Sequence, residues 1–192
     1  MVYHHALRIV RSQRRVVIKM SGEKELQKAY ESILGQHFEQ AVEWFQKAIE
    51  QDPGNSDYHY KLSITYARSG KIDEALAHAR KAKALAPAEG AYDIQVRTLE
   101  AKQLCSKAER LLASGAEHDA LAASYLQHAV RLDPLEEATY VLLAATFARM
   151  KEYKDAIATL RDLLELDPEH RTARALLGQY QQSFANYLED TR

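Results

Sequence analysis

The chain has 192 residues, of which 46% are hydrophobic, so it is long enough and apolar enough to bury a core of its own. That composition excludes a wholly disordered protein, and the formal net charge of −1 disfavours a nucleic-acid binder, which needs a basic field to hold phosphates. The single cysteine, Cys105, excludes an intrachain disulfide, and no Cys/His spacing resembles a zinc site.

The N-terminal segment differs in composition from the rest of the chain. Its first 19 residues contain no acidic side chain and five cationic ones, which are Arg8, Arg11, Arg14, Arg15 and Lys19. We predict that residues 1–20 form a basic tail outside the fold and that residues 21–192 form the folded domain. The tail is either a disordered extension or the product of an upstream translation start, with Met20 as the natural beginning, or else a transit-like or anionic-surface-binding helix.

Apolar runs in the chain are short. None approaches the ~20 residues of a membrane-spanning helix, and the N-terminal segment lacks the run of roughly 7–15 residues that a signal peptide needs. We therefore expect a cytoplasmic protein without a membrane span.

The prolines reveal an internal repeat. They are Pro53, Pro87, Pro134 and Pro168, and their separations are 34, 47 and 34 residues, so two of the three intervals share one period. An alanine lies twelve residues before each proline, namely Ala41, Ala75, Ala122 and Ala156. Proline ends a helix, and a small residue at a fixed place lets two helices approach closely. The pattern predicts helix pairs that each close in the same way.

Four such pairs fill most of the chain. We place the repeats at about 22–55, 56–89, 90–136 and 137–170, and a terminal capping helix at about 171–189. The third repeat is longer than the others. Pro87 and Gly115 are 28 residues apart, whereas Pro53 and Gly70 are 17 apart, so the first helix of this repeat gains about three turns. The added apolar residues either pack internally or form a second contact surface or dimer seam; they are Leu104, Ala108, Leu111 and Leu112.

The 34-residue helix–turn–helix unit resembles the tetratricopeptide repeat. Its first helix carries Leu62, Tyr66 and Gly70 in the second repeat, and its second helix carries the alanine and proline described above. The resemblance covers roughly residues 22–188. It implies an all-α fold, an α-solenoid of four tetratricopeptide-like helix pairs plus a C-terminal capping helix. It also implies a protein-protein interaction scaffold or adaptor whose first helices line a concave groove.

Projection of the sequence onto that pattern gives a candidate partner-binding set. The groove residues are Tyr60, Lys61, Ile64, Arg68, Ile94, Gln95, Thr98, Lys102, Val141, Leu142, Ala145 and Arg149. This surface is apolar with a cationic edge, which favours an apolar helix or extended segment of a partner protein. Relatives that grip a C-terminal carboxylate use a clamp of lysine, asparagine and arginine, and this chain lacks it. The cations at 68, 102 and 149 either complement the dipoles of their helices or form a basic ladder.

Catalysis is not expected. The sequence has no HExxH, no GxSxG and no glycine-rich phosphate loop, so we predict no enzyme, no cofactor and no metal. The cluster Glu117-His118-Asp119 is interpreted as a solvated hairpin tip that caps a helix, and Cys105 as a small packing residue. The alternative function is a self-assembling structural module, a homo-oligomer that associates through the lengthened third-repeat helix.

Overall fold

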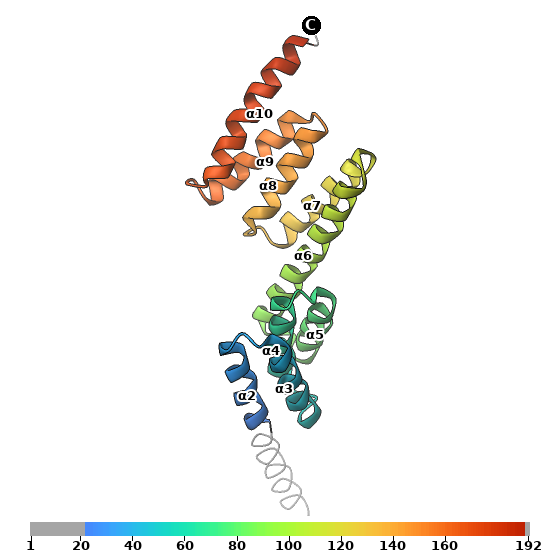
Figure 1. The fold of residues 1–192 in the computed structure, drawn as a ribbon, viewed down its shortest axis with the longest axis vertical. Helices are drawn as coiled ribbons and strands as arrows, with labels where there is room; N and C mark the ends of the chain where they lie inside the picture. Colours follow the sequence, from blue (N-terminus) through green and yellow to red (C-terminus); the bar gives the residue numbers. More distant parts are fainter. Residues whose placement is uncertain (1–21, 191–192) are drawn as a thin grey trace, which may run out of the picture. The chain divides into compact units, whose positions relative to one another are not determined.

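The computed structural model describes residues 22–190, and every regular element in that range is a helix (Figure 1). The all-α prediction is therefore confirmed. The helices are α2 (Glu23–Leu34), α3 (Phe38–Gln51), α4 (Ser56–Arg68), α5 (Ile72–Leu85), α6 (Gly90–Ser114), α7 (Asp119–Leu132), α8 (Glu137–Arg149), α9 (Tyr153–Leu166) and α10 (Arg171–Asp190), with a short 3-10 turn at Ala116–His118 before α7. The predicted basic tail lies outside the described residues.

One turn geometry joins the two helices of three pairs, α2–α3, α4–α5 and α8–α9. Each turn places one residue in the left-handed region, Gln36 with φ 60°, Gly70 with φ 75° and Lys151 with φ 63°. The next residue in each case donates its N–H to a carbonyl five residues back, at Ser32, Tyr66 and Phe147. This is the Schellman arrangement that satisfies the last carbonyls of a helix. The recurrence shows that Gln36 is the first-repeat counterpart of Gly70.

The second helices end as the proline pattern predicts. They end at Gln51, Leu85, Leu132 and Leu166, and a proline follows two residues later each time. The residue after each helix donates its N–H to the carbonyl four residues back, which closes the last turn. At the start of α4, the Asn55 side chain accepts hydrogen bonds from the N–H groups of Asp57 and Tyr58, as an N-cap residue does.

The described residues divide into two compact units, 22–99 and 100–190. In the first unit, α2 packs on α3, α3 on α4 and α4 on α5, around a core that includes Phe45, Leu62 and Leu99. In the second, α7 packs on α8, α8 on α9 and α9 on α10, around a core that includes Leu126 and Leu160. Within residues 22–190 no helix is both long and apolar enough to cross a membrane.

The four alanines that precede the prolines are fully buried, with 0% of each exposed. Three of them belong to the two cores just described, and each lies on a second helix of a pair. Their position explains the repeat at the level of packing, because an alanine there leaves no side chain to hold the neighbouring helix away.

Helix α6 contains the boundary between the units and contributes to both cores. It is 25 residues long, compared with 13 for α4 and 13 for α8. Val96 lies in the core of the first unit, and Ala108 lies in the core of the second. Leu111 and Leu112 pack against that second core, so most of the added apolar residues are used internally.

Candidate binding surface

Helix α4 carries four of the predicted contact residues, and the aromatic one among them has neighbours within the first unit. The rings of Tyr60 and Tyr92 lie 4.9 Å apart between centroids. The Tyr92 hydroxyl oxygen is 3.3 Å from the Ser56 hydroxyl oxygen, so one donates to the other. Ile64 is half-buried one turn further along α4. These contacts hold a tyrosine pair in place on the face of the first unit.

Charged side chains flank the tyrosine pair. The Lys61 ammonium group donates to the Asp57 carboxylate at 2.5 Å and lies 5.5 Å from the centroid of the Tyr30 ring. Arg68, at the C-terminal end of α4, is exposed and makes no hydrogen bond or ion pair within residues 22–190. Of the two predicted cations on α4, one is therefore neutralised locally and the other is available.

The start of α6 completes the surface of the first unit. Ile94 has 62% of its area exposed, and several other large apolar side chains of the described residues are exposed as well. Gln95 donates from its side-chain nitrogen to the Ser63 hydroxyl at 3.4 Å, and Thr98 is half-buried. The Gln95 contact joins α6 to α4, and Ile94, the preceding residue on α6, stays exposed.

The predicted contact residues of the second unit lie in a different environment. Val141 and Leu142 are half-buried and pack against the core of that unit, and Ala145 is also half-buried. Lys102 is exposed and makes no ion pair within the described residues. This face therefore offers less free apolar area than the face of the first unit.

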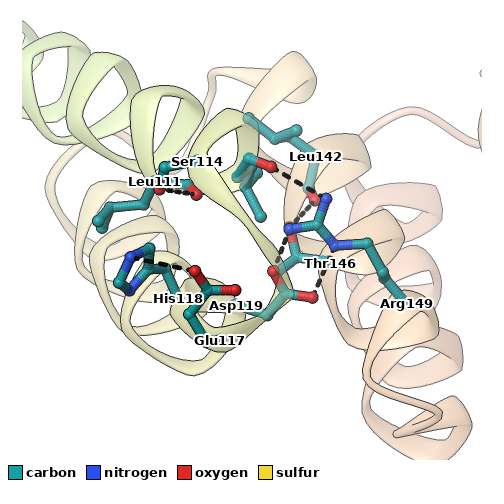
Figure 2. Close-up of polar contacts among 9 residues, drawn as sticks. Leu111, Ser114, Glu117, His118, Asp119, Leu142, Thr146 and Arg149 are labelled. Carbon is teal, nitrogen blue, oxygen red and sulfur yellow. Dashed lines mark hydrogen bonds and ion pairs between the residues drawn. The ribbon is translucent and has the colours of Figure 1, made fainter.

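Arg149 forms the most elaborate polar contact of the second unit. Its guanidinium holds both oxygens of the Asp119 carboxylate, with Nε 2.6 Å from Oδ2, and Nη1 donates to the carbonyl of Leu112 at 3.2 Å (Figure 2). Asp119 is only 3% exposed. The hydrogen bond from Arg149 holds the pKa of this carboxyl below its usual range, although burial opposes the shift.

This pair alters two predictions from the sequence. The prediction that residues 117–119 form a solvated tip holds for Glu117, which is exposed, but is wrong for Asp119, which is the buried first residue of α7. Arg149 is the last residue of α8, where a cation complements the helix dipole. It forms an ion pair with Asp119, so it is not a free cation of the predicted basic ladder. Among the three predicted ladder cations, Arg68 and Lys102 are the unpaired ones.

A histidine pair that the sequence did not single out lies in the first unit. Nδ1 of His59 is 3.0 Å from Nδ1 of His78, and Nε2 of His59 is 3.4 Å from the carbonyl oxygen of Pro53. A carbonyl can only accept, so His59 carries its hydrogen on Nε2 and accepts from His78. Burial lowers the pKa of both rings; the Pro53 carbonyl opposes the shift at His59, Lys81 adds to it there, and the His59 ring adds to it at His78.

We expect acid to destabilise the first unit through this pair. The unfolded chain takes up protons near the usual histidine pKa of 6.5, whereas the folded pair resists them. Stability is therefore complete above pH 6.5 and falls as the pH drops below it, by at most ~1.4 kcal/mol per pH unit for each ring. Urea unfolding measures the free energy of unfolding at each pH. This free energy should vary less with pH in His78→Phe than in the parent. It should vary as in the parent in His128→Gln, which changes an exposed ring. An equal pH dependence of stability in the parent and both variants would show that the His59–His78 pair does not cause it.

Cys105 is half-buried, and burial raises the pKa of its thiol, while a 3.4 Å contact with the Thr139 hydroxyl opposes the shift. A raised pKa keeps the thiol protonated and a poor nucleophile at neutral pH. Residues 22–190 contain no group of three or more His, Cys, Asp or Glu side chains that could hold a metal ion. The absence of catalysis stays a prediction.

Comparisons with known proteins agree with the helix pairs. One tetratricopeptide-repeat model matches residues 44–77, and another matches residues 25–55 and 138–170, which correspond to α2–α3 and α8–α9. No curated protein matches the sequence. Solved structures of MamA are similar in fold. A MamA from Desulfovibrio magneticus RS-1 has 16% identity and a TM-score of 0.54, over 88% of this chain and 90% of that one. Another MamA structure has 17% identity and a TM-score of 0.50, over 88% and 91%.

Helix pairs that share one turn geometry and one buried alanine position define a helical-repeat scaffold, which exposes the faces of its first helices. The matches to the two repeat models identify the family of this scaffold. The chain is a member of the tetratricopeptide-repeat family.

Proposed function

We propose that this protein is an interaction scaffold that binds a helix or an extended segment of a partner protein on its first-helix faces. The observation that carries the proposal is that the first unit combines the exposed side chain of Ile94 with the Tyr60–Tyr92 pair. Rigid aromatic rings next to an exposed aliphatic side chain are the usual anchors of a protein interface. Arg68 supplies an unpaired cation at the edge of this face.

The expected ligand is an apolar segment with acidic residues along one side. Its apolar side chains would cover Ile94 and Tyr60, and its carboxylates would meet Arg68 on the same unit. Arg149 would contribute little to this recognition, because it is engaged by Asp119. The residues Val141, Leu142 and Ala145 would serve mainly as packing, since they are half-buried in the second unit.

Binding kinetics of a partner recovered from the native cell test this proposal. Ile94→Ala and Tyr60→Ala should speed dissociation by about tenfold, since buried anchors set residence time. Arg68→Glu should mainly slow association and weaken its salt dependence. Leu135→Ala is the matched control, because Leu135 is 78% exposed between α7 and α8. A partner that binds all variants as tightly as the parent would place its site elsewhere.

Self-association through α6 remains the alternative function, and light scattering of the pure protein distinguishes it. Few of the added apolar residues of α6 are left to contact a second copy of the chain. Ala108 is fully buried, and Leu111 and Leu112 pack against the core of the second unit. Of the four added apolar residues, Leu104 is half-buried and is the one that lies outside the core cluster. A concentration-dependent mass that Leu104→Glu abolishes without loss of helix content would favour this alternative over the scaffold.

A further inference from the structure

Trp44 is the only tryptophan in the chain, and two lysines converge on it. Its indole is half-buried on α3, where it packs against the core of the first unit. The ammonium groups of Lys28, from α2, and Lys47, from α3, each lie 4.2 Å from the centroid of the ring. The cluster lies on α2 and the second helix α3, apart from the α4 and α6 residues proposed above as the partner-binding face.

These two lysines differ from other lysines of the same unit in having no carboxylate. Lys61, Lys71 and Lys83 pair with Asp57, Glu39 and Asp93, whereas Lys28 and Lys47 make no ion pair within residues 22–190. The ring attracts the two charges but does not neutralise them. Two ammonium groups close to one indole ring therefore add positive charge to this part of α2 and α3, in a chain whose net charge is −1.

A shallow depression of about 280 Å³ opens beside the indole, lined by Lys28, Glu31, Ser32, His37, Gln40 and Trp44. The Ser32 hydroxyl lies at its buried side, 2.8 Å from the Lys28 carbonyl oxygen and 3.3 Å from Oε1 of Gln40. The side-chain nitrogen of Gln40 makes no hydrogen bond within the described residues, so it is a free donor. A second open depression, over the turn between α2 and α3, shares His37 and Gln40 with the first.

We propose that this depression, which we call the Trp44 pocket, binds an acidic peptide segment of a partner protein. A carboxylate of the segment meets Lys28 or Lys47, an adjacent apolar side chain packs on the free part of the indole, and the Gln40 amide donates to the peptide. Charge complementarity identifies this occupant, because the cations have no carboxylate of their own. Glu31, which lines this depression, and Glu39, which lines the second one, disfavour a densely charged polyanion such as nucleic acid, which could not avoid them.

Tryptophan emission of the full chain reports on this pocket directly, because Trp44 is the sole source. Titration with a short peptide of alternating glutamate and leucine should give a saturable change in emission that high salt weakens. The same peptide with glutamine in place of glutamate should bind at least about tenfold more weakly. Fluorescence anisotropy of a labelled peptide provides a second readout that does not depend on the indole.

Charge variants decide whether the response arises at this pocket. Lys28→Glu with Lys47→Glu should weaken binding about tenfold or more, and the milder pair Lys28→Gln with Lys47→Gln should weaken it in the same direction if the first does not fold. The control pair Lys107→Glu with Arg110→Glu makes the same change in net charge at exposed cations of α6 and should bind like the parent. Equal affinity in the two glutamate pairs, tighter binding of the glutamine peptide, or loss of binding only in Arg68→Glu would overturn the proposal.

Discussion

Replacing Asp119 with alanine is expected to lower the free energy of unfolding by about 1.5–3 kcal/mol, the usual contribution of hydrogen bonds to a charged group. The carboxylate is buried at the start of α7 and joins α7 to the end of α8 through the Arg149 guanidinium. It also stands in the first turn of its helix, where a negative charge is favoured by the dipole. Its loss removes both interactions and leaves Arg149 with the Leu112 carbonyl alone.

The opposite replacement, Arg149→Met, should destabilise the protein more than Asp119→Ala does. It leaves a buried carboxylate without its partner, whereas the arginine left by Asp119→Ala is partly exposed and can turn to water. Because the pair lowers the pKa of Asp119, its stabilisation is complete above the usual value of 3.8 and is lost as the pH falls through the lowered value.

Urea unfolding of the two single variants and the double variant, combined in a double-mutant cycle, measures this coupling. Glu117→Ala is the control, since Glu117 is an exposed carboxylate two residues away. A cycle with no coupling energy, or equal losses for Glu117→Ala and Asp119→Ala, would show that the pair contributes nothing to the fold.

Enlarging the fully buried alanines is expected to destabilise each unit by about 1–3 kcal/mol, the usual cost of overpacking a close contact. Ala75→Leu tests the first unit and Ala156→Leu tests the second, because both side chains are 0% exposed on second helices. The added carbon atoms would have to displace a neighbouring helix.

The matched controls are Ala77→Leu and Ala158→Leu, which make the same change two residues away at exposed positions of α5 and α9. These should stay within about 0.5 kcal/mol of the parent, as surface substitutions usually do. Thermal and urea unfolding report the difference. Equal stability of the buried and exposed variants would mean that the helices do not meet closely at the repeated alanine.

The periodic features of the fold could be predicted from the sequence because they depend on local chemistry. A proline ends each second helix by its own geometry, and the spacing of Ala75 and Ala156 before Pro87 and Pro168 places both on the buried side of a helix. The second helix of the first repeat, at 38–51, was predictable for the same reason. The capping helix could be placed at 171–189 because its apolar residues keep a helical period, and it spans Arg171–Asp190.

Contacts between positions outside the repeat could not be predicted. Asp119 and Arg149 are 30 residues apart and have no equivalent pair in another repeat, so no pattern connects them. His59 and His78 meet only because α4 and α5 pack side by side. Gln36 and Lys151 adopt the left-handed turn that glycine occupies at Gly70, so composition alone did not mark these turns.

The proposal that the first unit presents a partner-binding face is tested most directly by site-specific photo-crosslinking in the native cell. A photoreactive side chain at Ile94 is exposed within the predicted contact set, whereas one at Leu135 is more exposed but lies outside that set. We expect one specific partner protein to be captured from Ile94, to be lost when Tyr60→Ala is added, and to be absent from Leu135. Capture of the same partner from Leu135 and not from Ile94 would contradict the proposed face.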